Sequence, residues 1–357
     1  GGDIWTVPAT GGEARLLVAH PANDTRPLYS PDGTRLAFVS TRTGNGDVYV
    51  LTLRTGQLTR LTYDDAAETL SAWSRDGQWL YFHSSSQDIS GMQDVYRVRS
   101  SGGTPTAVAA DRYASEFFGA PSPDGQTLAV SARGTAAGQW WRKGRSHLDE
   151  AELWLVQTGG ATPSYTRLTD DGGEKALWPQ WSADGNTVYY MSDRTGPENL
   201  WARAVRGGSA TQLTQFSNGR VLWPSIAHDG SAIVFERDFG IWRYDVAAKR
   251  AAQVAITLRG ASSTRGTERS TLSTGFQIAL SGDAKKVALI GRGELWAADA
   301  REGGEATRLT QSAALETQAR WLRGDQAVVY VAWTADGARL MRHDVLAGTT
   351  RALTTQG

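Results

Sequence analysis

The sequence predicts an all-β fold, a β-propeller built from four-stranded antiparallel blades. The first observation is a repeat, because the segment Tyr29–Val39 (YSPDGTRLAFV) recurs in outline along the chain. Its Asp-Gly pairs begin at positions 32, 76, 124, 184 and 229, which gives steps of 44, 48, 60 and 45 residues. Periods of about 40 to 45 residues with short β-segments are typical of propeller blades.

Composition is the second observation, and it also excludes several classes of protein. The 357 residues include 40 Gly and 14 Trp, which is typical of tight turns and short strands. Lys plus Arg and Asp plus Glu both number 37, and this zero net charge argues against nucleic-acid binding. Without cysteine there are no disulfides, thiolate nucleophiles or Cys-built zinc sites. No apolar run of about 18 residues predicts a membrane span, and we expect no cofactor.

The third observation is the hairpin that opens each repeat. In Ser30-Pro31-Asp32-Gly33, proline suits the second turn position and glycine suits the left-handed position that follows. The strand after the turn, residues 36–39, is apolar on both faces. Both faces of an antiparallel sheet are buried when blades stack radially, whereas one face of a single open sheet stays wet.

A second hairpin follows, and its first strand carries an acidic or amide residue two positions before an aromatic one, as in Asp47-Val48-Tyr49. A glycine turn then leads to a strand that ends near Leu-Thr. Eight second hairpins but seven first hairpins are present, so residues 1–20 form a half blade. We therefore expect one propeller over 1–357, with seven full repeats plus the half blade, in a ring of seven or eight blades. The repeats are about 22–65, 66–112, 113–172, 173–218, 219–260, 267–312 and 313–357.

These units resemble the PD40 (WD40-like) repeats of TolB-type propellers. A narrower resemblance is to the N-terminal propeller of bacterial tricorn-protease homologues, which are serine peptidases. It rests on the segments 139–150 (QWWRKGRSHLDE), 177–181 (LWPQW) and 235–242 (FERDFGIW).

This resemblance implies a propeller that is not catalytic. In the family, the propeller is thought to guide peptides toward a C-terminal protease domain preceded by a PDZ domain. A peptide, a partner protein or that PDZ/peptidase region of the same parent chain is therefore the implied partner. The resemblance also implies a periplasmic or extracellular location, and the composition leaves the cytoplasm open.

One face of the propeller is expected to vary. The loops after strands one and three of each blade are uniform tight turns, whereas the loop after strand two and the connection between blades differ in length. Extra residues at 133–151 and the polar stretch 259–270 both fall on this second face. Function often resides in such loops on a rigid scaffold.

Tryptophans outside the strand cores are candidate binding residues on this variable face. Trp178 and Trp223 occupy equivalent positions, six residues before the turn aspartate of adjacent repeats. They form either an aromatic shelf at the channel mouth or local packing between blades. Trp140, Trp141 and Trp333 fall on the same face.

Charged residues at equivalent positions suggest an asymmetric mouth. Eight residues before the turn aspartate stand Asp24, Glu68 and Glu116, and the degenerate last repeat places Glu316 there. Lys175 and Arg220 lie one position earlier in the repeats that carry the two tryptophans. An acidic arc facing these cations and aromatics could orient an extended peptide by its ends. The other reading is a set of solvated loop charges.

No catalytic constellation emerges from the motifs. The five histidines lack zinc-protease spacing, and no G-x-S-x-G elbow or phosphate-binding glycine motif occurs. The segment 146–150 holds triad residue types, but adjacent side chains splay apart, so His147 is predicted to contact a ligand or partner instead. Two alternatives stay open: a TolB-like envelope module that holds another protein, and a lyase or hydrolase with its site in the channel.

Overall fold

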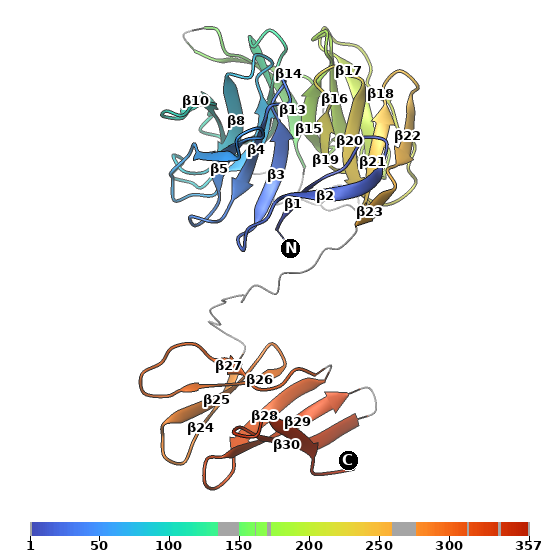
Figure 1. Cartoon of the computed structure of the whole chain (residues 1–357). Helices are drawn as coiled ribbons and strands as arrows, with labels where there is room; N and C mark the ends of the chain where they lie inside the picture. The colour runs from blue at the N-terminus through green and yellow to red at the C-terminus, as the bar shows by residue number, and fades with distance from the viewer. Residues whose placement is uncertain are drawn as a thin grey trace. The chain divides into compact units, whose positions relative to one another are not determined.

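The computed structural model describes residues 2–134, 150–160, 162–169, 173–258, 276–312, 314–334 and 337–355, and every regular element within them is a β-strand. Two compact units are present, Gly1–Gly266 and Thr267–Gly357 (Figure 1). We describe each unit by itself. A single propeller over 1–357 stays a prediction.

The described part of the first unit holds five four-stranded antiparallel sheets, with the strands of each adjacent in chain order (Figure 1). The strands are β3 (Asp24–Tyr29), β4 (Arg35–Ser40), β5 (Asp47–Thr52), β6 (Gln57–Arg60); β7 (Thr69–Trp73), β8 (Trp79–Ser84), β9 (Asp94–Arg99), β10 (Thr106–Ala109); β11 (Ala114–Pro121), β12 (Thr127–Gly134), β13 (Glu152–Gln157), β14 (Ser164–Arg167); β15 (Ala176–Trp181), β16 (Thr187–Ser192), β17 (Asn199–Ala204), β18 (Thr211–Gln212); β19 (Leu222–Ile226), β20 (Ala232–Arg237), β21 (Gly240–Asp245) and β22 (Arg250–Gln253).

The predicted half blade is a three-stranded sheet in the same unit. It consists of β1 (Ile4–Thr6), β2 (Gly12–Val18) and β23 (Ile256–Leu258). β23 pairs parallel to β2, with Gly12 opposite Ile256. A strand that follows the fifth full sheet therefore completes the sheet that begins the chain.

The second unit holds two four-stranded antiparallel sheets in its described residues. Their strands are β24 (Phe276–Leu280), β25 (Lys286–Gly291), β26 (Glu294–Asp299), β27 (Thr307–Arg308); β28 (Leu315–Trp321), β29 (Ala327–Thr334), β30 (Gly337–Asp344) and β31 (Thr349–Ala352). Together with the first unit, this confirms the prediction of seven full repeats plus an N-terminal half blade.

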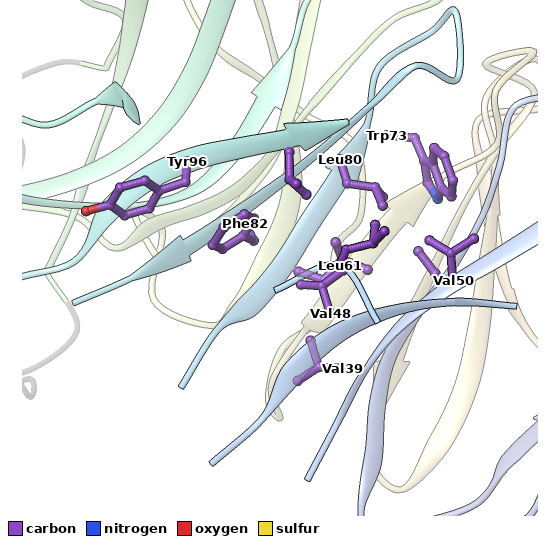
Figure 2. Close-up of a cluster of buried hydrophobic side chains, with 11 residues drawn as sticks. Val39, Val48, Val50, Leu61, Trp73, Leu80, Phe82 and Tyr96 are labelled. Carbon is purple, nitrogen blue, oxygen red and sulfur yellow. The ribbon is translucent and has the colours of Figure 1, made fainter. Parts of the chain in front are cut away.

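Apolar side chains fill the space between consecutive sheets. Figure 2 shows one such cluster, in which Val48 and Val50 of β5 lie close to Leu80 and Phe82 of β8. All four are at most 4% exposed. The strand 36–39, predicted to be covered on both faces, is at most 6% exposed at each position. Burial of this apolar surface is the main favourable term in holding one sheet on the next.

The tight turns form as the sequence predicts. Gly33 has a φ of 68°, and its N–H donates to the Ser30 carbonyl at 2.8 Å. The Ser30 hydroxyl donates to Asp32 Oδ1 at 2.5 Å, and such hydrogen bonds lower the pKa of Asp32 to about 2. In the two degenerate repeats Ala284 and Asp325 take the left-handed position.

A β-bulge interrupts the first strand of most four-stranded sheets. In β3 the register against β4 shifts between Thr25 and Leu28, so that two residues oppose one. In five of these sheets, all but that of β7, the first residue of the bulge has a positive φ of 54° to 58° although it is not glycine. These bulge residues are Arg26, Phe118, Trp178 and Trp223 in the first unit and Gln318 in the second.

Candidate functional site

Two cavities lie along the first strands of the sheets in the first unit. The larger has a volume of about 1010 Å³ and is lined by parts of β3, β7, β11, β15 and β19 together with residues at the Asp-Gly turns. We call it the turn-side cavity. The smaller, of about 410 Å³, is lined by the earlier parts of β11, β15 and β19 together with residues such as His83, and we call it the loop-side cavity. Trp223 lines both of them.

The four bulge residues of the first unit meet between these cavities, and we call them the bulge cluster. The rings of Trp178 and Trp223 have centroids 5.1 Å apart, and the Phe118 ring lies 5.4 Å from Trp178. The Arg26 guanidinium lies 4.6 Å from the Trp223 ring and 5.9 Å from the Phe118 ring. The left-handed backbone at each bulge brings together side chains from four different sheets.

Arg26 is the charged member of the bulge cluster. Its Nε donates to the Leu70 carbonyl at 3.1 Å. The side chain is half-buried and lines the turn-side cavity, and loss of hydration there lowers its pKa to about 10. At neutral pH it is a cation in the cavity wall.

His83 borders the bulge cluster on the loop side. The Phe118 N–H donates to His83 Nδ1 at 3.3 Å, so this nitrogen is the acceptor. Burial and the nearby charge of Arg26 lower the pKa of His83 to about 3. The imidazole is therefore neutral at physiological pH, and its ring packs edge-on against Phe118 at 4.9 Å.

The two predicted tryptophans are brought together, but they differ in exposure. Trp178 is 4% exposed and Trp223 is 43% exposed. Sequence reasoning missed Arg26, Phe118 and His83. The signal for the first two was present, because both stand six residues before a turn aspartate, where Trp178 and Trp223 were noticed only for being tryptophan.

The predicted acidic arc is corrected by burial. Asp24 is 6% exposed and pairs with Arg42 at 2.9 Å, while Glu68 accepts from the Thr62 hydroxyl at 2.8 Å and is 4% exposed. Glu116 is 1% exposed and accepts from a backbone N–H. None of the three lines either cavity, so they neither face the channel nor lie in solvent as loop charges.

Burial also changes the acidity of two of these carboxyl groups. It raises the pKa of Glu68 to about 8 and the pKa of Glu116 to about 7. Glu316, in the second unit, is fully buried and accepts from the Leu295 N–H at 2.7 Å and from the Thr310 hydroxyl. Glu68 and Glu316 thus accept from the threonine that ends the preceding repeat.

The predicted cations share one carboxylate. Lys175 is buried, and its Nζ lies 3.0 Å from Glu198 Oε1. Arg220 Nε lies 3.3 Å from the same oxygen, with its side chain 59% exposed. Arg220 lines the loop-side cavity, whereas Lys175 lines neither.

Three predicted site residues, Trp140, Trp141 and His147, lie outside the described residues, as does the stretch 259–270. Within the ranges that are described, no group of three His, Asp or Glu side chains could hold a metal ion. In the same ranges no helix is long and apolar enough to cross a membrane.

Repeated four-stranded sheets, Asp-Gly turns and first strands that line a cavity define a β-propeller protein of the PD40 type. Residues 1–250 match the family model of the tricorn protease N-terminal beta propeller domain. The chain belongs to this family.

Individual relatives agree with this membership. Tricorn protease homolog 1 of Streptomyces coelicolor is 27% identical over 206 residues, which cover 57% of this chain and 18% of the relative. The chain therefore spans only a small part of that protein's length. In fold, the chain is similar to the crystal structure of the tricorn protease, with a TM-score of 0.63 and 17% identity over 99% of this chain and 34% of that one. A putative TolB from Agrobacterium tumefaciens gives a TM-score of 0.53 at 21% identity, over 67% of this chain and 83% of that one.

Proposed function

We propose that this chain is a non-catalytic propeller that binds peptides or a peptide-like segment of a partner in its channel, as an accessory region of a tricorn-like serine peptidase. The observation that carries the proposal is the bulge cluster. Four strained, non-glycine positions from four sheets converge on one point between two cavities. Strain of this kind persists where the surrounding structure enforces it, and it gathers at ligand-binding and switch sites.

The chemistry of the cavities supports a peptide as ligand. Trp73, Trp181 and Trp223 line the turn-side cavity, and Phe117, Phe118 and Trp178 line the loop-side one. Aromatic rings combine a large apolar area with low conformational entropy, and they are frequent anchors in recognition sites. Because Trp223 lines both cavities, a movement of its ring could connect or separate them, which is the gating part of the proposal.

The test is a binding experiment with the full chain and a panel of immobilised peptides. Trp223→Ala should weaken binding of the captured peptides by about tenfold, because it removes the half-exposed anchor. Tyr63→Ala is the matched control, since Tyr63 is an aromatic residue of the same unit that is 71% exposed and lines neither cavity. Equal binding by the two variants would refute the channel assignment.

Attachment to a peptidase is the second part of the proposal. It is supported by family membership and by the Streptomyces relative, whose name is that of a protease homologue. A PDZ/peptidase region expressed separately should bind this chain in analytical ultracentrifugation. Failure to associate at micromolar concentration would count against an accessory role in that peptidase.

The alternative is a TolB-like envelope module that holds a folded protein on its outer surface. The similarity in fold to the putative TolB structure is the observation that supports this alternative. Either role would place the chain in the periplasm or outside the cell, which fractionation of the source cells tests. A partner whose binding is insensitive to Trp223→Ala would support this alternative over channel binding.

A further inference from the structure

The two cavities of the first unit are lined by charge of one sign. The turn-side cavity has Arg26, Arg75 and Arg243 in its wall, and the loop-side cavity has Arg133 and Arg220. Of the described residues that line either cavity, none is Asp or Glu. The chain as a whole is neutral, so this lining is a local enrichment rather than a consequence of composition.

Several of these arginines already have partners. Arg243 pairs with Asp245 at 3.1 Å, and Arg220 lies 3.3 Å from Glu198. Arg75 donates to the carbonyl of His228 at 3.1 Å. The carboxylates neutralise part of the charge of Arg243 and Arg220, and these contacts occupy part of the hydrogen-bonding capacity of all three arginines.

Arg26 differs from them at the bulge cluster. The Leu70 carbonyl is neutral, and no carboxylate among the described residues forms an ion pair with Arg26. Its guanidinium stacks on Trp223 at 4.6 Å, which fixes the plane of the group. A partly dehydrated cation without a counter-ion is costly, and an anion that enters the cavity would offset that cost.

The geometry of Arg26 indicates which anion suits it. Nε is committed to the Leu70 carbonyl, and no described residue accepts a hydrogen bond from its two terminal nitrogens. A guanidinium with free terminal N–H groups matches the two oxygens of a carboxylate in a bidentate pair. The surrounding wall of Leu28, Trp73 and Ile226 suits the apolar side chains of a peptide.

We propose that the channel of the first unit selects peptides by a carboxylate, which Arg26 binds in the turn-side cavity while Trp223 holds the guanidinium in place. This inference deepens the proposed peptide binding and rests on it. A cavity of about 1010 Å³ is at the upper end of ligand sites, which are about 300 to 1,000 Å³, so it has room for a short extended segment. The carboxylate is supplied either by the C-terminus of the peptide or by an acidic side chain.

Isothermal titration calorimetry with the full chain tests this inference, using three unlabelled, N-acetylated hexapeptides. The first is Ala-Leu-Phe-Ala-Leu-Phe with a free C-terminus, the second is its C-terminal amide, and the third is an amide with glutamate as its fifth residue. We expect the free acid to bind about tenfold or more tightly than the plain amide. Tight binding of the glutamate peptide as well would identify side chains as a second source of the carboxylate.

Two variants assign the effect to Arg26. Arg26→Asn removes the charge and keeps a residue that tolerates the left-handed backbone, so it should abolish the preference for the free acid. Arg26→Lys keeps the charge without the planar fork and should retain part of the preference. Arg54→Asn, at an exposed position that lines neither cavity, is the matched control and should bind like the unaltered chain.

The outcomes separate this inference from the proposed function. Equal binding of the free acid and the plain amide would overturn the inference and leave peptide binding standing. An acid preference that survives in Arg26→Asn would also overturn it. If the unaltered chain bound none of the three peptides, nor any in the immobilised panel, both proposals would fail.

Discussion

In β11, Glu116 and the bulge residue Phe118 are two residues apart, and yet they serve different parts of the molecule. On a regular strand, residues i and i+2 point to the same face. Here Glu116 is buried against its neighbours, while Phe118 reaches the cavity. The bulge between them, with Phe118 at a φ of 55°, separates the two directions. One residue with a left-handed backbone thus allows neighbouring positions of the same strand to serve two roles, packing between repeats and lining the cavity.

The largest loss of stability among the bulge residues is expected on substitution of Trp178. It is 4% exposed and packs on Phe118 and Trp223. Trp178→Ala should lower the free energy of unfolding by about 3 to 5 kcal/mol, because it leaves a cavity in the bulge cluster. Urea unfolding followed by circular dichroism measures this. A loss below about 1 kcal/mol would mean that the cluster does not hold the sheets together.

A smaller loss of stability is expected when the buried carboxyl group of Glu116 is removed. Glu116→Ala removes the acceptor of the Asp111 N–H, at 2.7 Å, and should cost about 1 to 3 kcal/mol of stability. Glu152→Ala is the control, since Glu152 makes a partly exposed pair with Arg167 at 3.3 Å and should cost about 1 kcal/mol or less. Equal losses in the two variants would break the distinction between buried and surface carboxylates.

The pH dependence of stability tests the buried carboxylates without removing them. Folding raises the pKa of Glu68 to about 8 from 4.5, so the folded chain binds more protons than the unfolded chain between these values. Stability contributed by Glu68 therefore falls as pH rises through this window. Below pH 6.5, His83 acts in the opposite sense, because folding lowers its pKa to about 3.

The measurement is accordingly made between pH 6.5 and 8. Glu68→Gln should flatten the decline of unfolding free energy in urea over this range, since the amide cannot ionise. Adding Glu116→Gln should flatten it further, because burial raises the pKa of that group to about 7. A decline of unchanged slope in the double variant would show that other groups carry it.

The smallest effect on stability is expected at Trp223. It occupies the same bulge position as Trp178 but is 43% exposed. Trp223→Ala should lower the unfolding free energy by about 1 to 2 kcal/mol, since the lost contacts with Trp178, Phe118 and Arg26 come from a side chain that is nearly half exposed. A loss as large as that of Trp178→Ala in the same urea experiment would contradict the assignment of Trp223 to the cavity surface.

The fold was predictable because its signals are local. Each hairpin is specified by residues close together in the sequence: an Asp-Gly turn, an apolar strand, or an aromatic residue two positions after a polar one. Because these signals repeat along the chain, they together predict a propeller. The expected glycine conformation at Gly33 is confirmed. The addition of β23 to β2 was not predicted, because residues 12 and 256 are far apart in sequence and no turn chemistry links them.

The candidate site was predictable only in part. The position six residues before the turn aspartate was recognised at Trp178 and Trp223, and the structure brings those side chains together. The burial of Asp24, Glu68 and Glu116 was not predicted, because the alternation of side chains along a strand does not reveal where a bulge lies. Whether Glu68 faces solvent or Thr62 is decided by packing against the end of the preceding sheet, about which the sequence of β7 carries no signal.

The pairing of β23 with β2 has a consequence for synthesis on the ribosome. The first two strands emerge early, but the edge of β2 stays open until residues 256–258 have been made. An unpaired strand edge is a template for association with other chains. The edge of β2 must therefore remain without its pairing strand, or be covered by other groups, while the five four-stranded sheets that follow it are translated. Closure of the first unit therefore cannot precede the synthesis of β23.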